Sequence, residues 1–259
     1  MLDRALTCCG AVRYLLAGFD YLSKSYLMSL LTSLARQVTQ HVTVARAERI
    51  ASYAYRITLT GPTLAGWTYT PGQTLNVFFG LGATGAAASL RKRTYSVWGY
   101  DADRLELELA ICTFSDGPGA RWAAQCRPGD AVHFYGPGGK FLLNPTAPAH
   151  VFLGDVSCLS HFYALRRQVP PTVPVLSVIH AHHHDEVFAD LDGTRPLHVE
   201  AADALSALQY LQAAEVQGLR ALPGAQVYWG GLEATCIAGY RLLQREWPTL
   251  TVKAKPFWK

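Results

Sequence analysis

A four-residue run near the middle of the chain carries side chains that suit a flavin. Arg93-Thr94-Tyr95-Ser96 lies in a stretch that we expect to be a β-strand, whose side chains alternate between two faces. A guanidinium neutralises phosphate, a phenol ring stacks on an aromatic ring, and a serine hydroxyl can hydrogen-bond the N5 edge of a flavin. The run therefore predicts a flavin site with Tyr95 and Ser96 as candidate catalytic residues. An ordinary strand with polar outward residues is the alternative.

A glycine-rich run further along the chain predicts a turn that opens a helix. Residues 116–124 read Asp-Gly-Pro-Gly-Ala-Arg-Trp-Ala-Ala. The free amides and the positive dipole end of a helix N-terminus can bind a pyrophosphate, although a plain turn and helix cap would use the same residues. On the flavin interpretation, the cofactor-binding residues of this run are Gly117, Gly119, Ala120, Arg121 and Trp122.

A third group is the histidine tract His180-Ala181-His182-His183-His184-Asp185. Clustered imidazoles can bind a transition metal. We favour a solvent-facing loop at the carboxyl end of a strand, where an acidic residue would bind the ribose 2′-hydroxyl of NADH. Because the strand ends without such a residue, and histidine tolerates a 2′-phosphate better than a carboxylate does, the tract favours NADPH over NADH.

Three segments would position these residues. Residues 1–40 have leucines at helical spacing, which indicates a helical extension that packs on the body or forms an amphipathic surface for a membrane or partner. Residues 41–145 hold short alternating runs between Gly-Pro and Pro-Gly turns, which predict an antiparallel β-barrel. Residues 146–259 alternate strands with helices, which predicts a parallel α/β domain with ligands at the carboxyl ends of its strands.

The expected elements follow from the local pattern. In the first domain we expect strands over residues 41–46, 55–60, 75–79, 93–98, 104–111 and 131–135, with one short helix over 120–125. In the second we expect strands over residues 151–153, 173–179 and 226–229, and helices over 159–168, 202–219 and 233–247.

Composition narrows the class of protein. The 259 residues are 50% apolar and carry a net charge of +4 from 23 basic and 19 acidic side chains, too few and too scattered for a nucleic-acid binder. No apolar run reaches the roughly 18 residues that a membrane span needs. Six cysteines without a C-x-x-C pair, and no recognisable secretion signal, favour a reduced cytoplasmic setting and an organic redox cofactor. We expect a monomer.

The order of these motifs resembles the ferredoxin reductase superfamily and, within it, the siderophore-interacting proteins, which are flavin-dependent ferric-siderophore reductases. The resemblance covers residues 41–247. Arg93-Thr94-Tyr95-Ser96 is similar to the family's Arg-x-Tyr-Ser/Thr flavin motif, and residues 117–123 are similar to its Gly-Pro-Ala-Ser-x-Trp-Ala segment, with Ala120 in place of Ser. Residues 153–157 resemble the family's Gly-Asp-Glu-Thr turn and residues 229–233 its Trp-x-x-Gly-Glu element. The resemblance assigns to the nicotinamide cofactor Gly154, Asp155, Ser157, Gly231 and Glu233.

The function implied by the resemblance is reduction of an Fe(III)-siderophore to Fe(II) with electrons from NAD(P)H, carried by FAD, with release of iron in the cytoplasm. In this family the chain end lies close to the flavin. An anionic ferric complex would therefore meet the cationic and aromatic residues Lys253, Lys255, Trp258 and Lys259. Two alternatives stay open: a ferredoxin or flavodoxin reductase with a protein acceptor, and a non-catalytic metal-binding or membrane-associated module built on the histidine tract and the N-terminal helices.

Overall fold

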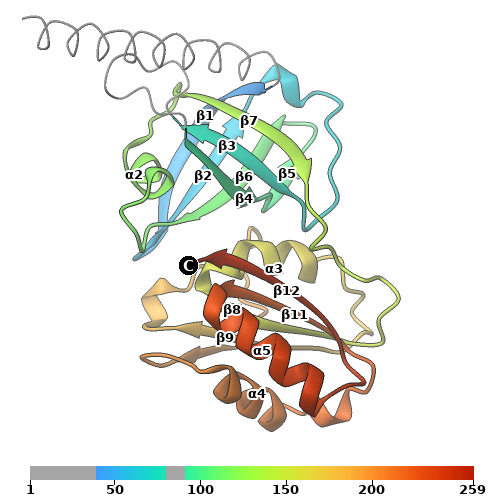
Figure 1. The fold of residues 1–259 in the computed structure, drawn as a ribbon. Coiled ribbons are helices and arrows are strands. Elements are labelled where there is room, and N and C mark those ends of the chain that lie inside the picture. Colours follow the sequence, from blue (N-terminus) through green and yellow to red (C-terminus); the bar gives the residue numbers. More distant parts are fainter. Residues whose placement is uncertain (1–38, 80–90) are drawn as a thin grey trace, which may run out of the picture.

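A computed structural model describes residues 39–79 and 91–259 of the chain. This part folds into two halves, one built on an antiparallel sheet and the other on a parallel sheet, as Figure 1 shows. The helical extension expected over residues 1–40 lies outside the described residues, apart from the last two, which lead into the first strand. Within the two described ranges, no helix has the length and apolar character that crossing a bilayer requires.

The first half is a seven-stranded antiparallel sheet. Its elements are β1 (Gln40–Ala51), β2 (Ala54–Thr60), β3 (Thr74–Phe79), β4 (Arg91–Ser96), β5 (Gly99–Asp101), β6 (Glu106–Cys112) and β7 (Ala131–Gly138), with the 3-10 turn η1 (Pro62–Leu64) and the helix α2 (Pro118–Gln125). The strand order is β4-β3-β7-β1-β2-β6-β5.

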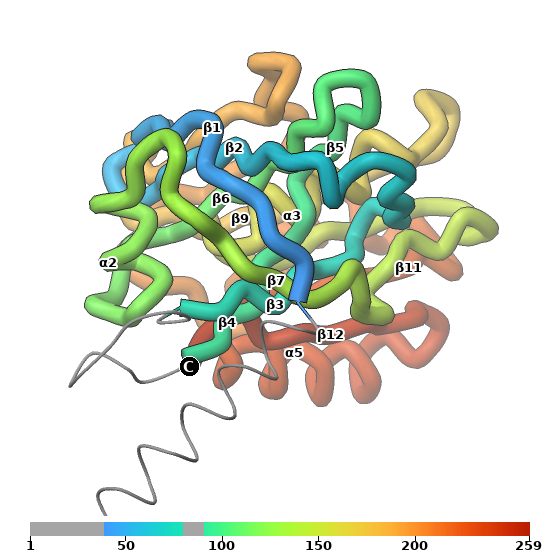
Figure 2. The backbone as a smooth tube through the Cα atoms, turned by 90° about the horizontal axis from the view of Figure 1, so that it is seen from above, coloured from blue at the N-terminus to red at the C-terminus, as the bar shows by residue number. Residues whose placement is uncertain are grey.

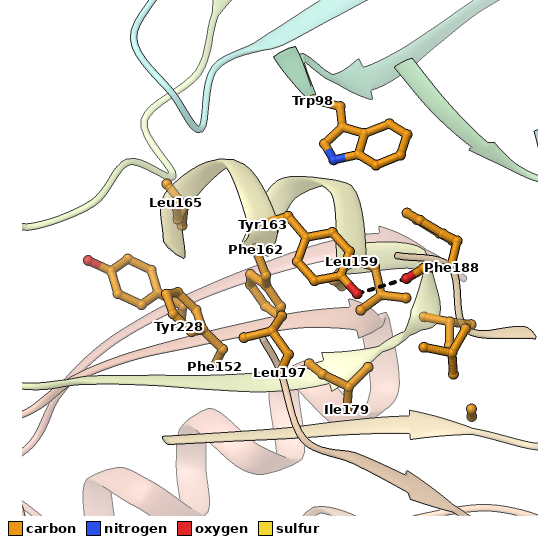
Figure 3. Packing of buried hydrophobic residues seen from close by; sticks show 14 of the residues in the cluster. Trp98, Phe152, Leu159, Phe162, Tyr163, Leu165, Ile179, Phe188, Leu197 and Tyr228 are labelled. Atoms are coloured by element: carbon orange, nitrogen blue, oxygen red, sulfur yellow. Dashed lines mark hydrogen bonds between the residues drawn. The ribbon is translucent and has the colours of Figure 1, made fainter. Parts of the chain in front are cut away.

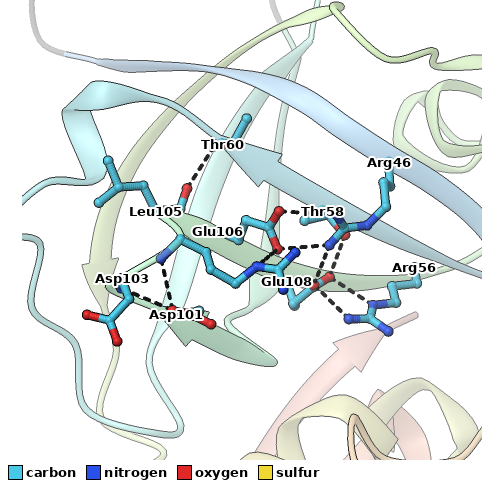
Figure 4. A network of polar contacts seen from close by, with 10 residues as sticks. Arg46, Arg56, Thr58, Thr60, Asp101, Asp103, Leu105, Glu106 and Glu108 are labelled. Atoms are coloured by element: carbon cyan, nitrogen blue, oxygen red, sulfur yellow. Dashed lines mark hydrogen bonds and ion pairs between the residues drawn. The ribbon is translucent and has the colours of Figure 1, made fainter.

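The alternating pattern of β6 divides its side chains between two environments. Leu107, Leu109 and Ile111 are at most 1% exposed and face the core of the sheet. Glu106 and Glu108 point the other way and accept paired hydrogen bonds from arginines on β1 and β2, with Arg46 Nη2 2.8 Å from Glu106 Oε2 and Arg56 Nη2 2.7 Å from Glu108 Oε1 (Figure 4). The strict alternation predicted for this strand is therefore confirmed.

The antiparallel sheet rolls up but does not close. β4 and β5 lie at opposite ends of the strand order, and no strand pairing within the described residues joins them. The chain passes from one to the other through Trp98, whose Nε1 donates to Asp190 Oδ1 of the second half at 2.8 Å. The Trp98 amide also donates to the Glu108 carbonyl of β6 at 2.9 Å, but no strand ladder joins β4 to β5 within the described residues. The predicted antiparallel sheet is therefore confirmed, whereas the predicted barrel is not closed.

The second half is a five-stranded parallel sheet in the order β10-β9-β8-β11-β12, covered by helices on both faces. The strands are β8 (His150–Asp155), β9 (Val175–Ala181), β10 (Val199–Ala201), β11 (Gln226–Leu232) and β12 (Thr251–Trp258). The helices are α3 (Leu159–Arg166), α4 (Ala207–Val216) and α5 (Glu233–Glu246), with the 3-10 turns η3 (Val156–Cys158), η4 (His184–Glu186) and η5 (Leu219–Ala221). Every residue of β8 is buried, as expected for a central parallel strand.

The two halves share a hydrophobic core on the α3 side of the parallel sheet. Figure 3 shows Trp98 from the first half above Tyr163 of α3 and Phe188, and Tyr163 Oη donates to the Phe188 carbonyl at 2.8 Å. Trp98 and Phe188 are each 2% exposed, with ring centroids 5.3 Å apart. Burying each such ring stabilises the fold by about 1.5–3 kcal/mol, so this contact holds the halves in one arrangement.

The last strand, β12, was not expected from the sequence. It pairs in parallel with β11 from Thr251 to Trp258 and forms one edge of the sheet. Figures 1 and 2 both place its carboxyl end beside β4 of the first half. The chain terminus is thus part of the junction between the two sheets and not a solvated tail.

Candidate functional site

A cleft of about 610 Å³ lies where the two sheets meet. It is bounded by the end of β4, the end of β6, the turn before α2, the start of α3 and the end of β12. Its lining residues are Arg93, Thr94, Tyr95, Ser96, Ala110, Cys112, Phe114, Ser115, Gly117, Gly119, Ala120, Ser157, Ser160, Phe257, Trp258 and Lys259. The structure therefore brings together the two runs from which the sequence predicts a flavin site.

The four residues of the predicted flavin motif end β4 and face this cleft. Thr94 Oγ1 donates to Asn76 Oδ1 on β3 at 2.9 Å, which ties the motif to its neighbouring strand. Arg93 is exposed and donates from Nη1 to the Lys92 carbonyl at 2.9 Å. Burial raises the pKa of Tyr95, so its hydroxyl keeps its proton.

The start of α2 meets Tyr95 across the cleft. A Cβ atom on Gly119 would overlap the Tyr95 hydroxyl oxygen, so the close approach of the strand to the helix requires glycine at this position. Gly117 precedes the helix, Pro118 opens it, and within the described residues no side chain caps its first turn. The amides of Gly119 and Ala120 thus have no side-chain cap, whereas Pro118 has no N–H; the predicted role of this turn in binding a pyrophosphate stays a prediction.

Two residues predicted to bind the cofactor from α2 have other contacts. Arg121 Nη1 pairs with Asp116 Oδ2 at 2.9 Å on the surface. Trp122 packs against Phe79 with ring centroids 5.5 Å apart, in the core of the antiparallel sheet. Neither belongs to the residues that line the cleft.

Ser96 contacts a histidine that the sequence did not single out. Its Oγ lies 2.9 Å from Nδ1 of His161 in α3, and Nε2 of the same ring lies 2.9 Å from the Phe141 carbonyl oxygen. His161 is fully buried, and desolvation, aided by the charge of Lys255, lowers its pKa to about 3. Its sequence neighbours give no signal of this contact, because Ser160 and Arg166 in the same helix are also polar.

A second pocket, of about 250 Å³, adjoins the cleft at the carboxyl ends of β8, β9 and β11. Phe114 and Trp258 line both cavities. The other lining residues are Asp155, Val156, His180, Ala181, His182, Glu186, Ala204, Leu205, Tyr210, Leu232 and Thr235. This edge is where open α/β sheets bind nucleotides, which agrees with the ligand position expected for this half.

Asp155 joins the strand ends at this edge. Its carboxylate accepts hydrogen bonds from the Ser157 amide at 3.0 Å, the Leu232 amide at 2.9 Å and Trp258 Nε1 at 2.9 Å. Gly231 has a φ of 108° and packs against this carboxylate so closely that a Cβ would overlap it. A side chain there would therefore displace Asp155.

Five residues were predicted to face the nicotinamide, and they divide into two groups. Asp155 lines the second pocket and Ser157 lines the cleft. Gly154, Gly231 and Glu233 do not belong to the lining of either cavity. Gly154 instead packs against the Gly230 carbonyl of β11, and its own carbonyl accepts from Tyr210 Oη at 3.1 Å.

The turn at the end of the histidine tract places Glu186 at the end of β9, where the sequence predicted no acidic residue. β9 ends at Ala181, and η4 turns the chain back so that Glu186 Oε2 accepts from the His182 amide at 2.9 Å. Glu186 is 4% exposed and lines the second pocket. The expectation that this strand end lacks a carboxylate is therefore wrong. The sequence did not reveal this position, because Glu186 comes five residues after the end of β9 and the turn η4 brings it back to the strand end.

The same tract does not gather as a metal site. His180 Nε2 lies 2.7 Å from the Ala202 carbonyl oxygen, and its ring stacks edge-on with that of His182 at 4.9 Å. Among residues 39–79 and 91–259, no three histidine, cysteine, aspartate or glutamate side chains come together as metal ligands would. The metal-binding alternative has no geometry to support it in this part of the chain.

The four residues predicted to bind the substrate do not lie together, because they are spread along the strand β12 and the residue that follows it. Trp258 and Lys259 reach the cleft, and Trp258 is 47% exposed. Lys253 Nζ donates to the Leu142 carbonyl at 2.9 Å, on the far part of β12. Lys255 is half-buried with its ammonium 5.5 Å from the Phe257 ring centre, and desolvation lowers its pKa. Lys253 and Lys255 are therefore not open to a ligand in the cleft.

Solved structures with similar folds define the fold class of this chain. The "siderophore utilization protein" from T. fusca superimposes with a TM-score of 0.69 at 20% identity, over 85% of this chain and 92% of that one. The siderophore-interacting protein SipS from Aeromonas hydrophila gives 0.66 at 20% identity, over 85% and 91%. A ferredoxin NADP+ reductase from Neisseria gonorrhoeae with bound FAD and NADP gives 0.64 at 14% identity, over 85% and 99%. The fold is that of the ferredoxin reductases.

Sequence comparisons show which proteins of this fold the chain resembles. Residues 81–141 match the model of the siderophore-interacting FAD-binding domain. The ferric vibriobactin reductase ViuB of Vibrio cholerae serotype O1 is 28% identical over 141 residues, which are 48% of this chain and 52% of ViuB. The chain thus spans about half the length of the curated relatives that it matches. The resemblance to the siderophore-interacting proteins is confirmed.

Proposed function

We propose that this protein is a flavoenzyme that uses NAD(P)H to reduce Fe(III)-siderophores to Fe(II). The observation that carries the proposal is the convergence of β4, the start of α2 and the end of β12 on one cleft, beside a second pocket at the carboxyl ends of the parallel strands. A redox cofactor in the first cavity and a nicotinamide in the second would lie side by side. The similarity to ViuB and to siderophore-interacting proteins supports the choice of substrate.

The donor set of the cleft fits FAD. The guanidinium of Arg93 and the uncapped amides at the start of α2 offer charge and hydrogen bonds to the pyrophosphate, and the Tyr95 ring offers a flat surface to the isoalloxazine. When bound, FAD would accept a hydride from the nicotinamide and pass its electrons singly to iron. The chain itself would bind the phosphates, orient the ring and contact its N5 edge through Ser96. We accordingly assign residues 41–145 to FAD and 146–259 to NAD(P)H.

The nicotinamide would enter the second pocket. Asp155 holds the ends of β8 and β11 and the Trp258 indole in place, so it acts as a positioning residue for this edge. Glu186 removes the sequence argument for NADPH, because a carboxylate does lie at the end of β9. The proposal therefore covers both nicotinamides.

The ferric complex would approach the open side of the cleft near the chain end. Trp258 and Lys259 line this side. The Lys259 ammonium favours an anionic complex, and the Trp258 ring can pack against a catecholate ring. Reduction releases iron because hard oxygen donors hold Fe(III) far better than Fe(II).

The decisive experiment measures cofactor and acceptor together. Purified protein should carry a flavin that is released by heat and identified as FAD by chromatography. With NADH or NADPH it should reduce a ferric tris-catecholate complex, with two Fe(II) trapped by a coloured chelator for each nicotinamide oxidised. A protein that turns over only with a ferredoxin or flavodoxin would support the protein-acceptor alternative, and one that binds no flavin would refute the proposal.

Lys259 and Lys253 provide a matched test of substrate binding. Lys259→Ala should raise KM for the anionic ferric complex by about two- to fivefold, the size of effect that an exposed charge gives, and the effect should shrink as salt screens the attraction. Lys253→Ala should leave KM unchanged, because that ammonium binds the Leu142 carbonyl outside the cleft. Steady-state kinetics at low and high salt, with ferricyanide as a control acceptor, check both. Equal KM changes in the two variants would contradict this placement of the substrate.

A further inference from the structure

His161 is a buried imidazole of the second half that reaches Ser96, a predicted flavin contact of the first half. It belongs to α3 and is 0% exposed, and both ring nitrogens are engaged, by Ser96 Oγ of β4 and by the Phe141 carbonyl. The neighbouring rings of Phe141 and Phe257 have centroids 5.1 and 5.6 Å from that of the imidazole. The ring is thus fixed in orientation as well as in position.

The hydrogen-bond chemistry sets the direction of the Ser96 contact. A carbonyl oxygen can only accept, so Nε2 of His161 must carry the hydrogen that bonds Phe141. Burial keeps the ring neutral, with a pKa of about 3, and a neutral imidazole has only one N–H. Nδ1 is then an acceptor, and the Ser96 hydroxyl must donate its single hydrogen to it.

Ser96 consequently has only lone pairs left for the cleft that it lines. A hydroxyl whose hydrogen is committed elsewhere can accept a hydrogen bond but cannot donate one. The N5 position of a flavin accepts a hydrogen bond when the ring is oxidised and donates one, as N5–H, when it is reduced. Ser96 would therefore accept a hydrogen bond from the reduced form and would have no hydrogen to donate to the oxidised form.

We propose that His161 is a positioning residue that holds the Ser96 hydroxyl as a hydrogen-bond acceptor and so favours the reduced, N5–H form of the flavin. This inference rests on the proposed flavin function. With the Ser96 hydroxyl held in this way, the bound flavin would be a better electron acceptor from the nicotinamide than it would be beside a freely rotating hydroxyl. No bond is made or broken by either residue, since the effect is a difference in the binding of two redox forms.

The test compares the midpoint potential of the bound flavin, measured by dye-coupled reductive titration, among four variants. His161→Phe keeps a planar ring but removes the acceptor, so Ser96 can turn its hydrogen toward oxidised N5. We expect a shift to more negative potential that corresponds to about a tenfold change in the reduced-to-oxidised preference, or roughly 30 mV for a two-electron couple. Ser96→Ala should shift the potential in the same direction. His161→Phe added to Ser96→Ala should cause no further shift.

His161→Asn supplies the rescue. Its side-chain oxygen can take the place of Nδ1 and accept from Ser96, so most of the wild-type potential should return although the bond to Phe141 is lost. A purely structural role for His161 predicts the opposite, because asparagine fills the apolar site worse than phenylalanine does. An unchanged potential in His161→Phe, or an equal shift in the Ser96→Ala background, would overturn the inference.

Two controls separate this inference from the proposed function. Imidazole ¹⁵N NMR of flavin-free protein should show hydrogen on Nε2 and none on Nδ1, and the opposite tautomer would overturn the inference without any reference to the flavin. If His161→Phe does not fold, the comparison of Ser96→Ala with His161→Asn tests the inference, because only Ser96→Ala should shift the potential strongly. Wild-type protein that binds no flavin would refute the proposed function itself.

Discussion

Replacing Gly119 with alanine is expected to empty the flavin site while the protein stays folded. The new Cβ would overlap the Tyr95 hydroxyl oxygen, so the Tyr95 ring must leave the position in which it faces the cleft. Because Tyr95 offers the flat surface for the isoalloxazine, we expect the FAD content of purified protein to fall about tenfold, the loss that about 1.4 kcal/mol of binding free energy gives. Quantitative chromatography of heat-released FAD against protein concentration measures this directly.

Gly117→Ala is the matched control for this substitution. Gly117 lies two residues earlier, has a φ of −71° that any residue can adopt, and would bring a Cβ no closer than 3.3 Å to the Ser115 hydroxyl. Because Gly117 itself lines the cleft but its Cβ would leave Tyr95 in place, FAD content should fall less than in Gly119→Ala. Alanine at position 119 also replaces glycine within a helix, which favours the helix by about 0.5–1 kcal/mol and offsets part of the cost of the overlap, so the protein should stay folded. Full FAD content in Gly119→Ala would show that the ring of Tyr95 is not part of the site.

The cleft that we propose to bind flavin was predictable because local sequence specifies most of its lining. Arg93-Thr94-Tyr95-Ser96 shows a strand with alternating side chains, and Gly117-Pro118-Gly119 shows a turn that opens a helix. Both signals depend on neighbouring residues in the chain. The resemblance to siderophore-interacting proteins then placed the two runs in one site, where the structure also places them.

The contacts that the sequence missed depend on long-range pairing in one case and on a local turn in another. His161 meets Ser96 across 65 positions, and nothing in the sequence of α3 shows that its imidazole would reach β4. Glu186 reaches the end of β9 only through the short turn η4. β12 was overlooked because Lys253-Ala254-Lys255-Pro256 alternates charged and small residues, a pattern that an exposed tail shares with an edge strand.

The open edge of the antiparallel sheet also depends on a contact between residues that are far apart in the chain. A continuous run over residues 93–98 was expected to be one strand of a barrel. The structure ends β4 at Ser96 because the next large side chain, Trp98, is buried against Phe188 of the second half. Nothing within the run distinguishes a tryptophan that packs inside its own sheet from one that packs against another domain.

That interdomain contact leads to the second large expected effect, a loss of stability in Asp190→Ala. The Asp190 carboxylate is 5% exposed and accepts hydrogen bonds from Trp98 Nε1 at 2.8 Å, from the Leu191 amide at 2.8 Å and from Arg167. Removing it leaves the indole N–H without its acceptor and a partly buried guanidinium without its counter-ion. Breaking a buried ion pair costs about 3–5 kcal/mol, and because the Arg167 side chain is 31% exposed we expect about 2–3 kcal/mol.

Asp192→Ala is the control, two residues away in the same loop. Its carboxylate accepts from the amide and the hydroxyl of Thr194 at the surface, at 2.9 and 2.7 Å, so its removal should leave the free energy of unfolding nearly unchanged. Urea denaturation followed by tryptophan fluorescence measures both variants, and Asp190→Ala should also weaken FAD retention because Trp98 lies two residues after Ser96. Equal, small changes in the two variants would mean that the apolar packing of Trp98, Tyr163 and Phe188 alone holds the halves together.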